Sequence, residues 1–145
     1  MQFIHRTFVV PTQDNVQVLD LTPQIQAWIE AEAIRQGQIT LIGQHTTTAL
    51  IVNECEDRLW ADIRVFLQKL APAGDRYLHN DLHLRDVPED EPINAHSHLM
   101  AMLLDTSVTI PIIDGGLGLG TYQSVLMLEL DGPRTRTVLG QILGV

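Results

Sequence analysis

The stretch Ile39-Thr-Leu-Ile-Gly-Gln-His-Thr-Thr-Thr-Ala-Leu-Ile-Val-Asn53 places two short apolar runs on either side of a polar segment that holds one histidine. Runs of about five residues rich in isoleucine, leucine and valine have the length of β-strands and are too short for typical helices. The stretch therefore predicts a strand at 39–43, a strand at 49–53 and a histidine-containing connection between them.

Upstream of this stretch the sequence predicts a β-hairpin. Phe3–Val10 mixes β-branched and aromatic residues, and the pattern returns at Val16–Leu19 after a turn-like segment at residues 11–15. Such residues pack well on a pleated surface, so we expect two antiparallel strands joined by a longer loop.

A first helix is expected from Pro23 to about Gln36. The hydroxyl of Thr22 can accept a hydrogen bond from an early backbone N–H, and proline loses nothing at the first helical position. Apolar residues then recur at helical spacing, and Gly37 can end the helix in a left-handed conformation.

Downstream, an apolar stripe between Leu59 and Leu70 predicts a second helix that begins among acidic residues and stops near 71–74. The polar connection Tyr77–Glu91 is long enough to suggest a functional or mobile segment. The sequence then predicts a short helix over Asn94–Leu104, strands at 108–113, 122–130 and 135–139, and a glycine turn at 114–116.

These elements together predict one α+β domain over residues 1–145, with a largely antiparallel or mixed sheet, two main helices and one short helix. The chain has 145 residues, of which 45% are hydrophobic and 19% charged. This length and composition suit a single soluble domain with its own core.

Composition also narrows the partners and the location. A formal charge of −9 without a segregated basic patch disfavours nucleic-acid binding. No run of about 18 apolar residues is present, so we expect no membrane association. A single cysteine, Cys55, excludes an internal disulfide framework and fits a reducing compartment, and we expect a cytoplasmic protein in which Cys55 is a small buried residue.

Histidines are concentrated in one part of the chain. His79, His83, His96 and His98 fall between residues 79 and 98, and His45 stands alone in the threonine-rich segment. Imidazoles with one carboxylate or water suit a divalent transition metal such as zinc. Loop histidines are also common at surfaces, and this plainer interpretation applies most to His83 and to His5.

Two other motifs have a structural and a functional interpretation. Thr46, Thr47 and Thr48 supply the hydroxyls and N–H groups of an anion cradle, although threonine is equally an ordinary strand residue. The glycines of Gly115–Gly120 are followed by a predicted strand and not by a helix, so we interpret them as a hairpin turn and not as a nucleotide-binding loop.

Four blocks of the sequence, in this order, resemble the YjbQ-like family. They cover the chain from about the first predicted helix to the end, and they are specific only in combination. The blocks are His45-Thr-Thr-Thr-Ala-Leu-Ile-Val-Asn-Glu54, Tyr77-Leu-His-Asn80, Asn94-Ala-His-Ser-His-Leu99 with Leu103-Leu104 and Thr106-Ser107, and Leu119-Gly-Thr-Tyr-Gln123 with Glu129-Leu-Asp-Gly-Pro-Arg134.

The resemblance implies a compact α+β fold, assembly as a homotrimer, and a pocket that holds a metal or an anion. It also implies a thiamine-phosphate synthase activity, in which the nitrogen of a thiazole phosphate displaces pyrophosphate from a pyrimidine methyl diphosphate. The expected partner is thus a small phosphorylated metabolite.

Matching the family's motifs assigns candidate roles to single residues. His45, His79 and His98 match motif histidines and are expected to hold a divalent metal, zinc being one candidate, or the diphosphate itself. His96 matches a less constant position and ranks last as a metal ligand. In addition, His45 and Gln123 are the candidate catalytic residues, with Gln123 orienting the substrate.

Phosphate binding is assigned to Thr46, Thr47, Thr48 and Arg134. The chain also departs from the family's pattern at three positions, Met100 in place of lysine, Asp105 in place of glycine and Tyr122 in place of tryptophan. With Met100 in place of the lysine, one positive charge that could favour diphosphate binding is missing.

Two alternatives to the synthase stay open. The first is a metal-dependent phosphate-ester hydrolase that uses the same histidines with Glu54 or Asp81 as general base. The second is a non-enzymatic, trimeric binding module for a metabolite or a metal.

Overall fold

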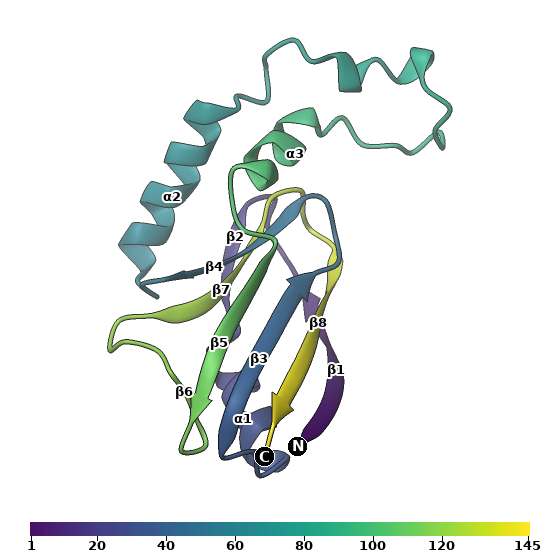
Figure 1. The fold of residues 1–145 in the computed structure, drawn as a ribbon. Coiled ribbons are helices and arrows are strands. Elements are labelled where there is room, and N and C mark those ends of the chain that lie inside the picture. Colours follow the sequence, from purple (N-terminus) through teal and green to yellow (C-terminus); the bar gives the residue numbers. More distant parts are fainter.

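The computed structural model describes all 145 residues and confirms the α+β class with one compact domain. Its strands and helices, with two short 3-10 turns, are β1 (Gln2–Pro11), β2 (Gln17–Asp20), α1 (Thr22–Ala31), β3 (Gln36–Gly43), β4 (Thr48–Asn53), α2 (Asp57–Leu70), η1 (Leu78–Asn80), η2 (Leu82–Leu84), α3 (Ala95–Met102), β5 (Ser107–Ile113), β6 (Gly116–Leu117), β7 (Ser124–Glu129) and β8 (Thr135–Gly144). Figure 1 shows their arrangement.

The strands form two antiparallel sheets. The larger sheet has the order β1-β8-β3-β5-β6, and the smaller one has the order β2-β7-β4. β3 and β4 are consecutive in the chain but belong to different sheets, so the polar segment Gln44–Thr47 between them crosses from one sheet to the other. The two strands expected at 39–43 and 49–53 are present.

The smaller sheet is buried on both faces, which explains the unbroken apolar run in β7. Val125 and Met127 belong to a core shared with α1 and the larger sheet, whereas Leu126 and Leu128 face a second core shared with α2 and α3. Because neighbouring strand residues point to opposite faces, a strand between two cores needs apolar residues at every position.

The predicted N-terminal hairpin is wrong. β1 pairs with β8 along its whole length, from Gln2 opposite Gly144 to Pro11 opposite Thr135, and β2 pairs with β7. The strands themselves were predicted by local residue preference, but their partners lie more than a hundred residues away in the sequence. Local patterns carry no information about such pairings.

The first helix is shorter than predicted, and both of its ends differ from the expectation. It stops at Ala31, and Ala33 takes up the left-handed conformation expected of Gly37. Gly37 lies instead in β3, where an added Cβ would sit 2.2 Å from the carbonyl oxygen of Leu143. The Thr22 hydroxyl accepts from the backbone N–H of Val125 and caps no helical amide, so it ties α1 to β7.

The second helix begins as its acidic start predicts. The Glu56 carboxylate accepts from the backbone N–H groups of Arg58 and Leu59 at 2.8 and 2.7 Å, which caps α2. The third helix, α3, lies within the predicted range. Cys55 is exposed, contrary to the expectation of a buried cysteine, because it belongs to the turn between β4 and α2.

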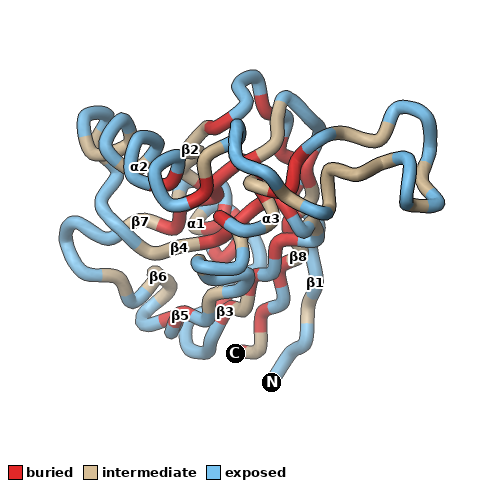
Figure 2. Tube along the Cα trace, turned by 90° about the horizontal axis from the view of Figure 1, so that it is seen from above, coloured by how far each residue is buried: buried red, intermediate tan, exposed pale blue.

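The long connection between α2 and α3 projects from the body of the molecule. Residues 77–93, which we call the arm, contain only the two 3-10 turns η1 and η2. The arm leaves beyond α2 and returns to α3 (Figure 1), and Figure 2 shows it extending away from the buried core. No helix in the structure is both long and apolar enough to span a bilayer.

Candidate functional site

A polar cavity of about 390 Å³ opens where the β3–β4 link, the base of the arm, α3 and the β7–β8 turn meet. Except for one proline, its lining consists of polar or charged residues. They are Gln44, His45, Thr46, Thr47, Glu91, Pro92, Asn94, His98, Asp131, Arg134 and Arg136. Five of the residues predicted from the sequence, His45, Thr46, Thr47, His98 and Arg134, thus lie together.

His45 is fixed on one wall by β8. Its Nε2 accepts from the backbone N–H of Thr137 at 2.9 Å and lies 3.2 Å from that residue's hydroxyl. The neutral ring therefore carries its proton on Nδ1. Burial, followed by the charge of Arg136, lowers the pKa of His45, although Glu129 opposes this effect. The ring is oriented and neutral, with Nδ1–H available to a ligand.

His98 reaches the cavity from α3 and packs edge-on against His79 of η1. The ring centroids are 4.8 Å apart and the planes meet at 74°. Burial, followed by the neighbouring His79, lowers the pKa of His98, and Asp131 opposes the shift. The Nε2 atom of His79 is buried without a hydrogen-bond partner. This pair joins the arm to the cavity wall.

One chain alone does not form the histidine metal site expected from the sequence. No three His, Cys, Asp or Glu side chains gather closely enough to hold a metal ion. His96 lies outside the cavity lining, with a buried Nδ1 that has no partner, because it is two residues from His98 on a helix and points elsewhere. The donors of a single chain therefore do not fit a metal.

Arg136, which lines the cavity, belongs to a buried ion pair with Glu129. The side chains of Arg136 and Glu129 are 4% and 0% exposed. Arg136 donates through Nε to Glu129 at 2.7 Å and through Nη2 to the other carboxylate oxygen and to the Thr47 hydroxyl. Burial raises the pKa of Glu129, but hydrogen bonds from Arg136, from the Asp131 backbone and from Thr12 outweigh it, so the pKa is lowered.

The β7–β8 turn carries a second, more exposed arginine. Arg134 pairs with Asp131 at 2.9 Å, and Asn94 donates to the same carboxylate oxygen at 2.7 Å. The side chain of Asn94 thus ties the start of α3 to this turn and does not cap the helix. Its Oδ1 is buried without a partner. Arg134, which the sequence analysis assigned to phosphate binding, lines the cavity.

The β3–β4 link supplies unpaired backbone donors. The N–H groups of His45, Thr46 and Thr47 donate to no backbone or side-chain acceptor in the chain. Successive free N–H groups of this kind are characteristic of anion-binding loops. Thr48 is buried in β4 and lines only a neighbouring hollow, so two of the three predicted threonines reach the polar cavity.

The neighbouring hollow, of about 280 Å³, shares His45, Thr46 and His98 with the polar cavity. Its remaining lining comes from Thr48 of β4, from the end of α3 and from Thr106 before β5, with Ala101 and Met102 as the apolar contribution. The two hollows therefore meet at the histidines, one side polar and the other partly apolar.

Gln123 does not reach this site within one chain. It is exposed just before β7, and its side chain accepts from the Gly120 N–H at 2.8 Å. Thr48 faces Glu129 at one end of the β4–β7 pair and Asn53 faces Ser124 at the other, so Gln123 is a strand's length from the cavity.

Other residues singled out in the sequence also lie elsewhere. Glu54 follows β4 at its far end, and Asp81 of the arm pairs with Arg76 at 2.7 Å. Neither residue lines the cavity. Met100, which stands where the family usually has lysine, is buried in the second core and does not line the polar cavity. Tyr122 is exposed before β7.

Sequence reasoning missed Asn94, Asp131, Glu129 and Arg136 as members of the site. A signal for the buried pair was present, because Glu129 is the single charge in an apolar strand, and a buried carboxylate requires a partner. Its partner could not be identified from local pattern, because β7 and β8 belong to different sheets and only the packing of those sheets brings Arg136 to Glu129.

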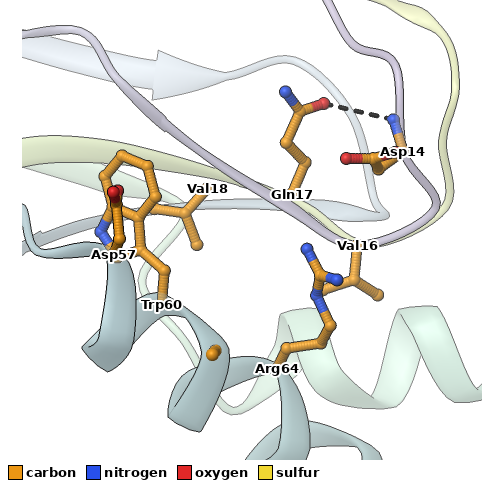
Figure 3. A pocket seen from close by; sticks show the side chains of 8 residues that line it. Asp14, Val16, Gln17, Val18, Asp57, Trp60 and Arg64 are labelled. Atoms are coloured by element: carbon orange, nitrogen blue, oxygen red, sulfur yellow. Dashed lines mark hydrogen bonds between the residues drawn. The ribbon is translucent and has the colours of Figure 1, made fainter.

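A second cavity, of about 310 Å³, has different chemistry. It is a groove between α2 and the β1–β2 segment, with Val16, Val18 and Trp60 in its lining and Asp14 and Arg64 beside them (Figure 3). The indole N–H of Trp60 is buried and has no partner.

Comparison with known proteins gives a consistent result. Residues 6–145 match the family model described as UPF0047 protein YjbQ-like. A UPF0047 protein of Archaeoglobus fulgidus is 42% identical over 132 residues, which cover 91% of this chain and 95% of that protein.

Solved structures agree with the sequence relatives. A hypothetical protein of Aeropyrum pernix K1 superposes with a TM-score of 0.88 at 37% identity, over 98% of this chain and 99% of that one. A protein of Sulfolobus solfataricus P2, described as YbjQ-like and of unknown function, gives a TM-score of 0.87 at 30% identity, over 99% of each chain.

Proposed function

The chain belongs to the YjbQ-like UPF0047 family, and from this premise we propose that it binds phosphorylated small molecules and acts as a thiamine-phosphate synthase. One observation carries the proposal. Two arginines, two oriented imidazoles and three unpaired backbone N–H groups meet in or beside a single cavity, which is a donor set suited to phosphate oxygens.

The proposed reaction makes specific demands on the protein. The thiazole nitrogen attacks the methylene carbon of the pyrimidine, a C–N bond forms, and the C–O bond to the diphosphate breaks with its electron pair leaving on pyrophosphate. The developing negative charge is stabilised by donors that are already in place before the reaction.

The cavity supplies such donors from the β3–β4 link and the β7–β8 turn. Arg134 and the 45–47 amides contact the phosphate oxygens in this proposal, and the Nδ1–H of His45 reaches the bridging oxygen. The organic groups of the substrates occupy the adjoining hollow beside Met102. No step is assigned to a metal, because one chain does not gather three metal ligands.

Assembly as a homotrimer is part of the proposal, and the arm supports it. Leu78 and Leu84 are 80% and 74% exposed on a segment that projects from the body, and Phe66 on α2 is also exposed. Apolar side chains on a projecting segment are typical of association surfaces. A role for Gln123 would require a second chain that brings it to its neighbour's cavity.

Leu84→Asp tests the assembly. We expect sedimentation equilibrium to show a trimer for the unaltered protein and a smaller species for the variant, while circular dichroism remains unchanged. A trimer that persists in the variant would show that the arm is not part of the interface.

A cytoplasmic location stays a prediction.

Binding without turnover is a second candidate function, and the carboxylates of the cavity favour it. Asp131 is paired with Arg134 and Glu91 lies 3.5 Å from Arg85, so neither is free to act as a general base. Hydrolase action through Glu54 or Asp81 is disfavoured because both lie outside the cavity. Saturable pyrophosphate binding with no product from any substrate pair would identify the binding module.

The synthase is tested by thiamine-phosphate formation with His98→Ala and a matched control, His83→Ala, on the exposed side of the arm. We expect a loss of about a hundredfold for His98→Ala and normal turnover for the control. Full turnover in both variants would contradict the assignment of the cavity.

A further inference from the structure

We infer that Arg136 is an oxyanion-binding residue of the polar cavity and that Glu129 is the positioning residue that aims it. The inference rests on the proposed function, because it needs an anionic ligand in this cavity. Neither residue was assigned a role by the sequence motifs.

The guanidinium of Arg136 is held on two of its three nitrogens. Nε and Nη2 donate to Glu129, and Nη2 also donates to the Thr47 hydroxyl at 2.9 Å. With the fork fixed on one side by a carboxylate and on the other by a hydroxyl, the side chain has a single orientation.

The third nitrogen, Nη1, is left without a partner in the chain. Nη1 makes no hydrogen bond within the chain, and it is not among the buried polar atoms that lack a partner. Arg136 lines the polar cavity, so the Nη1 donors open onto it. The same Thr47 that holds Nη2 carries one of the unpaired backbone N–H groups, which places both kinds of donor on one wall.

Glu129 is saturated with hydrogen bonds and cannot act as a base. Besides Arg136 it accepts from the Thr12 hydroxyl and from the Asp131 N–H, each at 2.9 Å. The Thr12 hydroxyl in turn accepts from the Arg134 N–H at 2.8 Å. One buried carboxylate therefore fixes both the Arg136 side chain and the turn that presents Arg134.

A buried ion pair with no role beyond stability would have both partners sealed from solvent. Here the carboxylate is sealed and the cation keeps one open edge, which is the arrangement needed to receive an oxyanion without moving. Glu129 offsets the charge of Arg136 while the cavity contains only water, which allows the guanidinium to stay buried.

The experiment measures pyrophosphate binding by calorimetry for the unaltered protein, for Arg136→Lys and for Arg64→Lys as a control in the groove of Figure 3. Lysine keeps a charge for Glu129 but lacks the second planar edge. We expect a Kd about tenfold higher for Arg136→Lys and an unchanged Kd for Arg64→Lys.

A second variant guards against misfolding. Glu129→Gln combined with Arg136→Met replaces the pair with neutral groups of similar size and is expected to stay folded. We expect it to lose at least as much affinity as Arg136→Lys. A folded double variant with unaltered affinity would overturn the inference.

The positioning role of Glu129 has its own readout. In the unaltered protein we expect pyrophosphate to shift the Nε and Nη resonances of Arg136 in ¹⁵N spectra. In Glu129→Gln these resonances should average and lose the shift. Unchanged resonances in the variant would overturn the positioning role.

The outcomes separate this inference from the function on which it rests. Pyrophosphate binding that is equal in the unaltered protein and in Arg136→Lys overturns the inference and leaves the proposed function standing. No binding of pyrophosphate to the unaltered protein overturns both.

Discussion

The polar cavity and the groove between α2 and β2 differ little in volume, about 390 and 310 Å³, but greatly in chemistry. In the cavity, Arg134 and Arg136 are each held by a carboxylate. In the groove, Arg64 extends from a helix, forms no ion pair, and lies beside an apolar surface that includes Trp60 (Figure 3). The comparison teaches that fixed donors, and not volume, mark a site suited to an anion.

The largest predicted difference between the two regions is in stability. Arg136→Met leaves Glu129 as an uncompensated buried charge, so we expect the free energy of unfolding to fall by about 3–5 kcal/mol. Arg64→Met removes an exposed charge and should change it by about 0.5 kcal/mol or less. Urea unfolding measures both. Equal losses would contradict the account of the ion pair.

Acid should weaken the cavity's framework through Glu129. Its folded-state pKa is lowered below the ordinary value of 4.5, so the carboxylate stabilises the folded protein above that value. The contribution is lost as the pH falls from 4.5 through the lowered pKa. Urea unfolding across this range should show a steeper loss for the unaltered protein than for Glu129→Gln. Parallel curves would exclude Glu129 as the source.

Anion affinity should depend on the histidines of the cavity and not on any group in the groove. The pKa values of His45 and His98 are lowered from 6.5, so both rings are largely neutral near pH 7. His98 faces His79, Arg85, Asp131 and Glu91, and its protonation adds a positive charge to the site. Affinity should therefore rise as the pH falls.

Sulfate is a suitable probe because its charge is constant over this range. We expect its affinity to increase as the pH falls below 6.5, and to stay nearly flat when His45 and His98 are both glutamine. Calorimetry at each pH makes the comparison. An unchanged pH dependence in the double variant would assign it to other groups.

The smallest effect on stability predicted for the cavity is at Thr47. Thr47→Val removes the hydroxyl that accepts from Arg136 at 2.9 Å in a buried position, so we expect a loss of about 1–2 kcal/mol in the free energy of unfolding. Thr40→Val removes the exposed hydroxyl pair with Thr109 and should cost about 0.5 kcal/mol or less. A larger loss at Thr40 would contradict the importance given to burial.

The sequence predicted much of the fold because strand and helix patterns are local. The strands expected at 39–43 and 49–53 and the acidic start of α2 all appear in the structure. The hairpin prediction failed because β1 finds its partner in β8, and no local feature of Phe3–Val10 encodes that choice.

The candidate site was likewise predictable where local motifs define it and not where distant residues meet. His45, Thr46, Thr47 and His98 were identified by motif and do meet, whereas Gln123, found by the same means, lies at the far end of β7. Arg136 was missed because its role depends on Glu129. The two residues lie in strands of different sheets, and no local sequence pattern shows that they meet.

The most direct test of the account is a titration of the ¹⁵N-labelled protein with pyrophosphate, followed by NMR. We predict saturable shifts of the His45, Thr46 and Thr47 amides and of the Arg136 side chain, while the indole signal of Trp60 in the groove stays in place. Shifts at Trp60 without shifts at residues 45–47, or no shifts at all, would contradict the assignment of the polar cavity as the binding site.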